Sequence, residues 1–231
     1  MFKELTKVFG ETVIYGFTGV AATFASLLLV PLFTRVLNPE EFGVLALITT
    51  LFSILLVIVN VGMGQAVFRT YFRASRKERA IVAGTSFISQ TAFPLVGSTA
   101  VFVLSGLTSR VLFGDERWTN LIQLSAIALF FNAGIQIPLT LLRVEGRSKN
   151  YVAINIIRIL ATVALSIILI LVFQQGLAGV FLANLIGALL GYLLALALVF
   201  RRITLTFSRF GWLRCSNLAS PCYRPGWRCG Y

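Results

Sequence analysis

Long runs of residues without a single charge dominate this chain. They cover residues 12–34, 42–68, 80–109 and 118–142. A further stretch, 150–200, contains one charged residue, Arg158. A helix needs about 20 apolar residues to cross the ~30 Å hydrocarbon core of a bilayer. Of the 231 residues, 58% are hydrophobic and 12% are charged, whereas a soluble domain has about 25% charged residues. The sequence therefore predicts an all-α, polytopic membrane helical bundle.

The stretch 150–200 is long enough for two spans. Gln174-Gln175-Gly176 is the natural break within it, because it is polar and ends in a glycine. Six transmembrane helices are thus expected, which form one lobe over residues 1–202. Their expected bounds are about 12–34, 43–66, 81–106, 118–142, 151–173 and 177–200.

Cations concentrate in alternate loops. The loops after the second and fourth spans and the segment after the sixth are rich in Arg and Lys. The acidic pairs Glu40-Glu41 and Asp115-Glu116 lie in the loops after the first and third spans, and the loop after the fifth has no charge. Because cytoplasmic loops carry the excess of Lys and Arg, we expect both termini on the cytoplasmic side.

Polar residues recur at helical spacing inside several predicted spans. These sets are Thr12, Gly16, Gly19, Thr23 and Ser26; Asn60 and Gln65; Ser86 and Gln90; Ser125, Asn132, Gln136 and Thr140; and Tyr151, Asn155, Arg158, Thr162 and Ser166. Steps of three or four put each set on one side of its helix. Such a side is expected to line the bundle interior or a water-filled cavity. The alternative is that these side chains hold neighbouring helices together.

Arg158 is the most informative single residue. It lies seven residues into the fifth span, roughly 10 Å below the cytoplasmic boundary. It is either a cation for an anionic substrate such as a phosphate or a side chain that snorkels to the headgroups. The candidate cavity residues are Arg158, Asn155, Asn60, Asn132 and Gln136.

Small residues and prolines also mark the spans. Ala183, Gly187, Gly191 and Ala195 recur every four residues in the sixth span, a ridge that permits close helix packing within one bundle or between two copies. Pro31, Pro94 and Pro138 are candidate kinks.

The composition disfavours catalysis. The chain has no His, and its one Asp is Asp115, which rules out His-based acid–base chemistry and argues against a metal site. No cofactor and no nucleic acid is expected, since the net charge of +12 comes from short loop clusters. A membrane glycosyl- or phosphotransferase is the enzyme alternative, but its carboxylates would have to come from scattered acids. We expect no enzyme.

Three segments carry a resemblance to a known family. The most specific is Pro31-Leu-Phe-Thr-Arg-Val-Leu-Asn-Pro-Glu-Glu-Phe-Gly43 between the first two spans. Weaker support comes from Asn60-Val-Gly-Met-Gly-Gln65 with Phe68-Arg-Thr-Tyr-Phe72, and from Leu142-Arg-Val-Glu-Gly-Arg147. These segments resemble the N-terminal lobe of oligosaccharide flippases, the polysaccharide biosynthesis family of the multidrug/oligosaccharidyl-lipid/polysaccharide flippase superfamily.

The resemblance implies a multi-pass protein of the bacterial cytoplasmic (inner) membrane. Such a protein moves polyprenyl-pyrophosphate-linked oligosaccharide across the bilayer for surface polysaccharide or lipopolysaccharide synthesis. Family members have two six-helix lobes around a cavity whose cations meet the pyrophosphate, and Arg35 matches the family's Arg after the first helix. The implied partners are the lipid bilayer, the lipid-linked oligosaccharide and a second lobe or copy. A small-molecule exporter of the same superfamily is an alternative.

The end of the chain departs from the family pattern. Residues 203–231 hold four Arg, the three Cys and no acid, and the apolar run of a seventh helix is missing. We expect this basic, Cys- and Trp-containing cytoplasmic tail to be truncated or frame-shifted from about residue 212. The other reading of the chain is therefore an inactive half-protein. The cysteines, at steps of seven, match no zinc or redox motif.

Overall fold

Helices make up all the regular structure in the described part of the chain. A computed structural model describes residues 2–60 and 76–199, and no strand occurs within these two ranges. The prediction of an all-α polytopic bundle is confirmed. The helices are α1 (Phe2–Val36), α2 (Pro39–Asn60), α4 (Arg76–Val103), α5 (Ser105–Phe113), α6 (Thr119–Gly134), α7 (Gln136–Val144), α8 (Ser148–Leu171) and α9 (Gly176–Val199).

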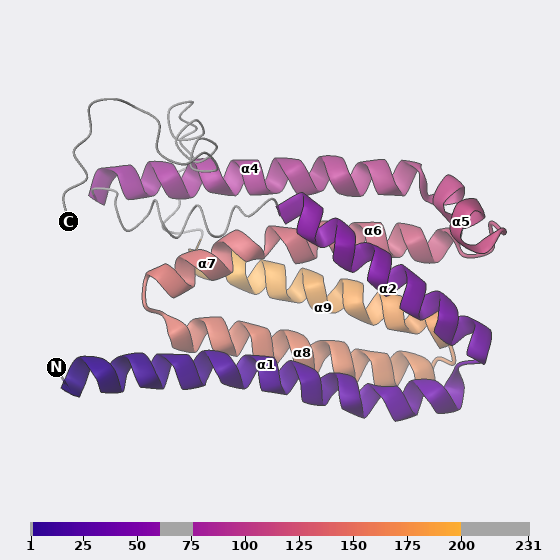
Figure 1. Cartoon of the computed structure of the whole chain (residues 1–231), viewed down its shortest axis with the longest axis horizontal. Helices are drawn as coiled ribbons and strands as arrows, with labels where there is room; N and C mark the ends of the chain where they lie inside the picture. The colour runs from indigo at the N-terminus through magenta and orange to yellow at the C-terminus, as the bar shows by residue number, and fades with distance from the viewer. Residues whose placement is uncertain (1, 61–75, 200–231) are drawn as a thin grey trace.

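The helices lie in a row of nearly parallel rods (Figure 1). Along this row α1 packs against α8, α8 against α9, α9 against α6, and α6 against α4. Helix α2 crosses obliquely over α6 and also contacts α4. Two segments far apart in the sequence, α1 and α8, therefore lie side by side, while the consecutive helices α1 and α2 diverge from a shared turn.

Five helices are long and apolar enough to cross a membrane. They are the segments Gly19–Val36, Pro39–Asn60, Thr119–Val144, Ser148–Leu171 and Gly176–Val199. The sixth crossing is the pair Gln90–Val103 and Ser105–Phe113, bent by 62°, if the two helices count as one span. The third predicted span, 81–106, thus corresponds to a bent pair of helices. The end of the second predicted span, residues 61–66, lies outside the described residues, as does the tail 203–231.

The fourth predicted span is divided at Ile135. Helix α6 ends at Gly134 and α7 begins at Gln136. Pro138 explains the break, because it has no N–H to donate to the Gly134 carbonyl and its ring crowds that carbonyl. Pro31 and Pro94, by contrast, lie inside helices that continue through them. Of the three candidate kinks, Pro138 is the one that follows a helix break.

The turn between α1 and α2 follows from local sequence signals. Pro39 occupies the first position of α2, where its missing N–H is not needed. The Asn38 N–H donates to Glu41 Oε2 at 3.0 Å. Glu40 and Glu41 both lie in the first turn, where carboxylates stabilise the positive end of the helix dipole. The acidic pair thus marks the start of α2.

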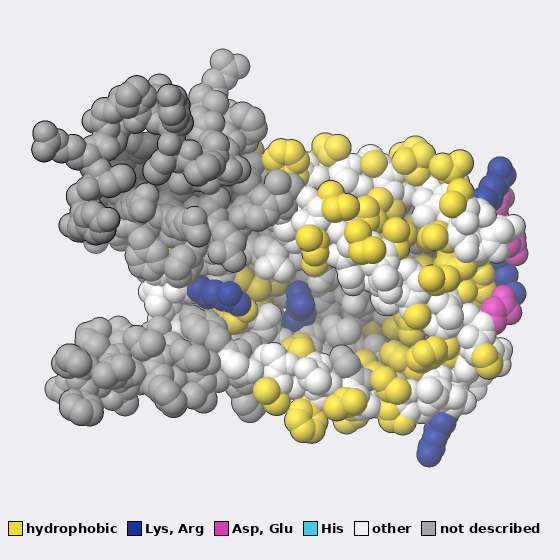
Figure 2. Space-filling view, in the orientation of Figure 1, with side chains coloured by type: hydrophobic (Ala, Val, Ile, Leu, Met, Phe, Trp, Pro, Cys, Tyr) yellow, Lys and Arg dark blue, Asp and Glu magenta, His cyan; other side chains and the backbone are white. Residues whose placement is uncertain are grey.

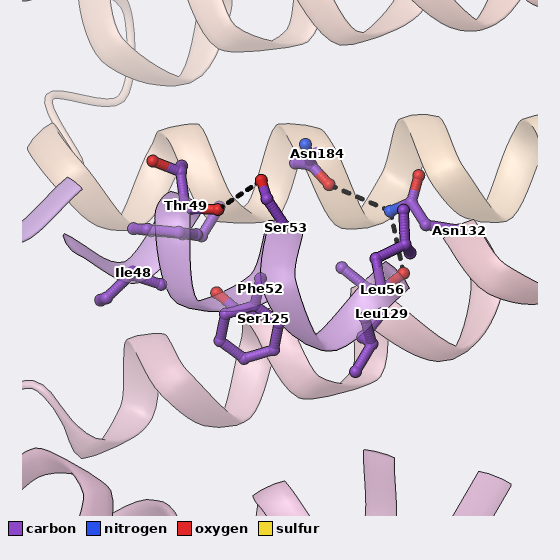
Figure 3. A pocket seen from close by; sticks show the side chains of 11 residues that line it. Ile48, Thr49, Phe52, Ser53, Leu56, Ser125, Leu129, Asn132 and Asn184 are labelled. Atoms are coloured by element: carbon purple, nitrogen blue, oxygen red, sulfur yellow. Dashed lines mark hydrogen bonds between the residues drawn. The ribbon is translucent and has the colours of Figure 1, made fainter. Parts of the chain in front are cut away.

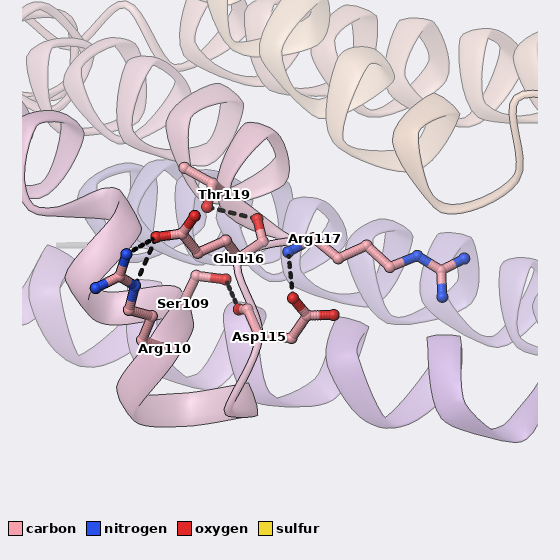
Figure 4. Close-up of polar contacts among 6 residues, drawn as sticks. All are labelled: Ser109, Arg110, Asp115, Glu116, Arg117 and Thr119. Carbon is pink, nitrogen blue, oxygen red and sulfur yellow. Dashed lines mark hydrogen bonds and ion pairs between the residues drawn. The ribbon is translucent and has the colours of Figure 1, made fainter.

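The connection from α5 to α6 is a compact polar turn (Figure 4). Ser109 Oγ donates to the Asp115 carbonyl at 2.6 Å, and Thr119 Oγ1 donates to the Glu116 carbonyl at 2.7 Å. Arg110 pairs with the Glu116 carboxylate, and Gly114 adopts a φ of +72°. Side-chain and backbone polar groups of this turn satisfy one another, which holds the bent pair α4–α5 against α6.

Charge and apolar surface separate along the bundle. Figure 2 shows acidic and basic side chains together at one end of the molecule and a broad band of apolar side chains along its length. The turns α1–α2, α5–α6 and α8–α9 share that end, and the α7–α8 turn lies at the other. Which end faces the cytoplasm stays a prediction.

Candidate functional site

The polar stripe of α8 packs against the ridge of small residues on α9. Gly187 lies against Thr162, and Gly191 lies against Arg158. All four ridge residues, Ala183, Gly187, Gly191 and Ala195, are buried. The ridge therefore serves helix packing within the bundle, as expected for small residues at every fourth position.

Gly191 lets the Arg158 side chain pass over α9. A Cβ atom at position 191 would lie 2.8 Å from Arg158 Cδ and 3.2 Å from Arg158 Cγ. It would also lie 3.1 Å from Ile135 Cδ1, a side chain with no exposed surface. The missing side chain at Gly191 is thus the space through which the Arg158 stem runs.

The guanidinium of Arg158 reaches across to α6. Its Nη1 donates to Asn132 Oδ1 at 3.4 Å. Asn132 in turn donates through Nδ2 to the Ala128 carbonyl at 2.9 Å and to Asn184 Oδ1 at 3.4 Å. Three helices, α8, α6 and α9, thereby share a chain of polar contacts that begins at a cation.

A pocket lies on the other side of Asn132, between α2, α6 and α9 (Figure 3). Its volume is about 220 Å³. Five polar side chains line it: Thr49, Ser53, Ser125, Asn132 and Asn184. The apolar lining is Ile48, Phe52, Leu56, Ala128, Leu129 and Phe181. Asn132 therefore contacts Arg158 and faces the pocket at once.

The residues of these polar contacts and of the pocket lie well inside their helices, away from the first turns. Arg158, Thr49, Ser53, Asn132 and Asn184 are eight to fourteen residues from the first residue of their helices. At ~1.5 Å per residue this is roughly 12–21 Å along a ~30 Å hydrocarbon core. The Arg158–Asn132 contact runs sideways between helices and not toward a headgroup layer, which argues against the snorkelling alternative.

Sequence comparison identifies the family. The profile of the polysaccharide biosynthesis protein family matches residues 9–218. The chain belongs to this family. Neither a curated protein nor a solved structure gives a significant match to the chain. As a polysaccharide biosynthesis protein with five to six apolar helices, it is a multi-pass membrane protein.

In this polysaccharide biosynthesis protein the predicted site residues fall into separate places. Arg158 and Asn132 come together, as described above. Asn155, one turn from Arg158, donates through Nδ2 to the Tyr151 carbonyl of its own helix at 2.8 Å. Gln136 is exposed just after the break at Ile135, and Arg35 is exposed in the last turn of α1. Neither Gln136 nor Arg35 lines the pocket.

Asn60 belongs to a second polar cluster. Gln90 Nε2 donates to Asn60 Oδ1 and, at 3.3 Å, to the Ala133 carbonyl. Gln90 is 2% exposed. Its amide therefore ties the end of α2 and the middle of α4 to α6, next to the break at Ile135. Gln65 lies outside the described residues, and the Ser86 side chain is likewise not described.

Three residues of the predicted polar stripe of α1 lie on the surface of the bundle, and the side chains of the other two, Thr12 and Ser26, lie outside the described part of the chain. Gly16, Gly19 and Thr23 are exposed, and no atom lies within 4 Å of a Cβ built on either glycine. Thr23 Oγ1 donates to the Gly19 carbonyl of its own helix at 3.1 Å. None of these three residues lines the pocket or takes part in the hydrogen bonds that link Arg158, Asn132 and Asn184.

Sequence reasoning missed Asn184, Thr49 and Ser53. Asn184 carries a signal that was available, because it is the one amide side chain in the otherwise apolar α9. No comparable sequence signal marks Thr49 and Ser53, since single hydroxyl residues are common in membrane helices and usually donate to the backbone of their own helix. No group of His, Cys, Asp and Glu suited to a metal ion occurs in the described residues.

Proposed function

We propose that this chain takes part in translocating polyprenyl-pyrophosphate-linked oligosaccharide across the bacterial cytoplasmic (inner) membrane. The product serves the synthesis of surface polysaccharide or lipopolysaccharide. The observation that carries the proposal is Arg158, a cation in the middle of α8 that donates to Asn132, one of the residues that line a polar pocket. Family membership supports the same role.

Among the described residues, Arg158 forms no ion pair with an acidic side chain. Beyond the first turn of α2, no Asp or Glu occurs in the five long spans or in residues 90–113. A central Arg costs about 2.5–3.5 kcal/mol on insertion scales, and such residues usually mark a substrate pathway. An anion that arrives with the substrate would offset this cost.

A pyrophosphate suits this cation. The planar guanidinium presents five N–H donors and pairs with phosphate oxygens through two parallel hydrogen bonds. The Asn132 contact engages one nitrogen, Nη1. Water is scarce at this level, so the attraction between guanidinium and phosphate is stronger than in bulk solvent. Arg158 is thus the phosphate-binding residue of the proposed translocator.

The exposed polar residues at the mouth of the pocket support a substrate path that runs beside α2 and α9. Thr49, Ser53 and Asn184 are exposed on the isolated chain although they lie in the middle of spans. Polar groups that face hydrocarbon cost free energy, so this face is expected to border the substrate path and a second lobe or second copy.

Complementation tests the proposal. The 231-residue chain is produced in a bacterium that lacks its own oligosaccharide flippase, and surface polysaccharide is measured. The chain should restore polymer, Arg158→Gln should abolish it, and Arg158→Lys should restore little because an ammonium lacks the planar fork. Arg110→Gln, at the exposed ion pair, is the matched control and should behave as the parent.

Two results contradict the proposal. One is absence of polymer while the chain is present in the membrane, which would favour an inactive half-protein. The other is full activity of Arg158→Gln, which would show that the cation has no part in translocation.

A further inference from the structure

Each hydroxyl group of the pocket donates its hydrogen to a backbone carbonyl of its own helix. The single hydrogen of the Thr49 hydroxyl is directed to the Leu45 carbonyl at 2.8 Å, with the Ala46 carbonyl at 3.0 Å as its alternative acceptor. Ser53 Oγ donates to the Thr49 carbonyl at 2.7 Å, and Ser125 Oγ donates to the Leu121 carbonyl at 2.8 Å. A hydroxyl has one hydrogen and two lone pairs, so these three oxygens remain as acceptors.

The two amides complete this pattern. Both hydrogens of Asn132 Nδ2 have acceptors, and Oδ1 accepts from Arg158 and keeps one lone pair. Asn184 Oδ1 accepts from Asn132, while its Nδ2 makes no hydrogen bond to the described residues. The pocket thus offers several acceptors and one amide donor, and no charged side chain lines it.

The pocket and Arg158 therefore have opposite hydrogen-bonding character. Arg158 is a donor with no acceptor atom. An ionised phosphate brings acceptors only, which suits Arg158 and not the hydroxyl oxygens of the pocket. A group that brings its own O–H donors suits the pocket. Asn132 joins the two places, so a ligand that spans them carries an anion directly beside a polyol.

We propose that the pocket between α2, α6 and α9 binds the sugar ring attached directly to the phosphate, while Arg158 binds the phosphate. This assignment rests on the proposed function. Sugar hydroxyls would donate to the Thr49, Ser53 and Ser125 oxygens and accept from Asn184 Nδ2. The apolar face of the ring would pack on Phe52 and its apolar neighbours.

The size of the pocket agrees with one ring. Its volume is about 220 Å³, below the ~300–1,000 Å³ that is typical for a whole drug-sized ligand. A single sugar ring therefore fits where an oligosaccharide does not. The rest of the glycan would extend through the mouth that Thr49, Ser53 and Asn184 border.

Binding of defined lipids to the purified full chain tests this assignment. The probes are undecaprenyl pyrophosphate and its derivatives with one glucose, galactose or N-acetylglucosamine. The readout is the sugar preference, the Kd of the sugar-free lipid divided by the Kd of a sugar-bearing lipid. The parent should prefer at least one sugar-bearing lipid by about tenfold or more, as expected for two or more neutral hydrogen bonds.

A matched pair of variants isolates the pocket. Thr49 and Thr50 are neighbours on α2, and each hydroxyl donates to a carbonyl four residues earlier, at 2.8 and 2.7 Å. Thr49 lines the pocket and Thr50 does not. Thr49→Val combined with Ser53→Ala should lower the sugar preference about three- to tenfold for each acceptor that binds the ring. Thr50→Val should leave the preference unchanged.

The outcomes separate the two proposals. Equal binding of sugar-free and sugar-bearing lipids by the parent overturns the sugar pocket, and so does the same preference in the Thr49 and Thr50 variants. Arg158→Gln should weaken binding of all four lipids and keep the preference. If Arg158→Gln binds sugar-free undecaprenyl pyrophosphate as the parent does, or if the parent binds none of the lipids, the proposed function fails.

Discussion

Replacing Gly191 by Ala should displace the Arg158 side chain. The new Cβ would lie 2.8 Å from Arg158 Cδ and 3.1 Å from Ile135 Cδ1. A distance under 3.0 Å between carbon atoms requires one of them to move. Ile135 is fully buried at the α6–α7 break, so we expect the arginine stem to move and the Asn132 contact to be lost.

The magnitude is a difference of two effects. An extra methyl group in a packed interior costs about 1–3 kcal/mol. Ala in place of Gly inside a helix returns about 1 kcal/mol. The net loss in the free energy of unfolding is therefore roughly 0–2 kcal/mol. We expect Gly191→Ala to reduce phosphate binding more strongly than it reduces the free energy of unfolding, because the guanidinium no longer lies beside Asn132.

Unfolding in mixed detergent micelles, followed by circular dichroism, measures the change in the free energy of unfolding. Gly43→Ala is the matched control, since no atom lies within 4 Å of a Cβ built there, and it should be stabilising by about 0.5–1 kcal/mol. In an Arg158→Ala background, Gly191→Ala should cost less, by about 0.5–2 kcal/mol of coupling. Zero coupling, or equal behaviour of the two alanine variants, would refute the argument that Arg158 runs across Gly191.

Three further predictions follow from the same packing. Gly187→Ala should destabilise the chain more than Gly191→Ala does, because its Cβ would meet the Thr162 hydroxyl and lie 3.2 Å from Thr162 Cβ; mixed-micelle unfolding checks the order. Gln90→Met should cost about 0.5–1.5 kcal/mol in the same assay, since the Ala133 carbonyl and the half-buried Asn60 oxygen lose their donor, while the buried Gln90 Oε1, which has no hydrogen-bond partner among the described residues, is removed, and an unchanged unfolding curve would contradict the role of this amide. Glu116→Gln should leave the unfolding midpoint within error at low and high salt, because Glu116 and Arg110 are exposed.

The sequence predicted the all-α class and the long apolar helices of the bundle, because charge-free runs are a direct consequence of the bilayer core. The third span shows the limit. Its residues 81–106 are uncharged throughout, yet α4 ends at Val103 and α5 bends away by 62°. The bend agrees with the contacts of Ser105 and Ser109, which reach Gln123 and the Asp115 carbonyl. Such contacts depend on which helix lies alongside, and periodicity does not contain that information.

The candidate site was predicted in part for the same reason. Arg158 and Asn132 stand out in sequence as costly groups inside spans, and the structure places them in contact. Helical spacing put Asn155 on the same face as Arg158, but its side chain bonds its own backbone. Spacing shows which residues share a face; the crossing of α2 over α6 decides that Thr49 and Ser53 meet Asn132.

The α8 stripe also shows that helix packing and ligand binding are not alternatives for a whole face. Thr162 donates to the Arg158 carbonyl at 2.9 Å and packs on Gly187, so its hydrogen is used and its surface is covered. One turn earlier, Arg158 packs its stem on Gly191 but extends its guanidinium to Asn132. Thr162 and Arg158 lie on the same polar stripe of α8, but they differ in how many hydrogen-bond donors remain unused. A polar residue inside a span is available to a substrate only through the donors or lone pairs that its contacts within the bundle leave over. Under the proposed function, Arg158 and not Thr162 is therefore the residue of the α8 stripe that would meet the phosphate, because Arg158 keeps N–H donors and the surface of Thr162 is covered.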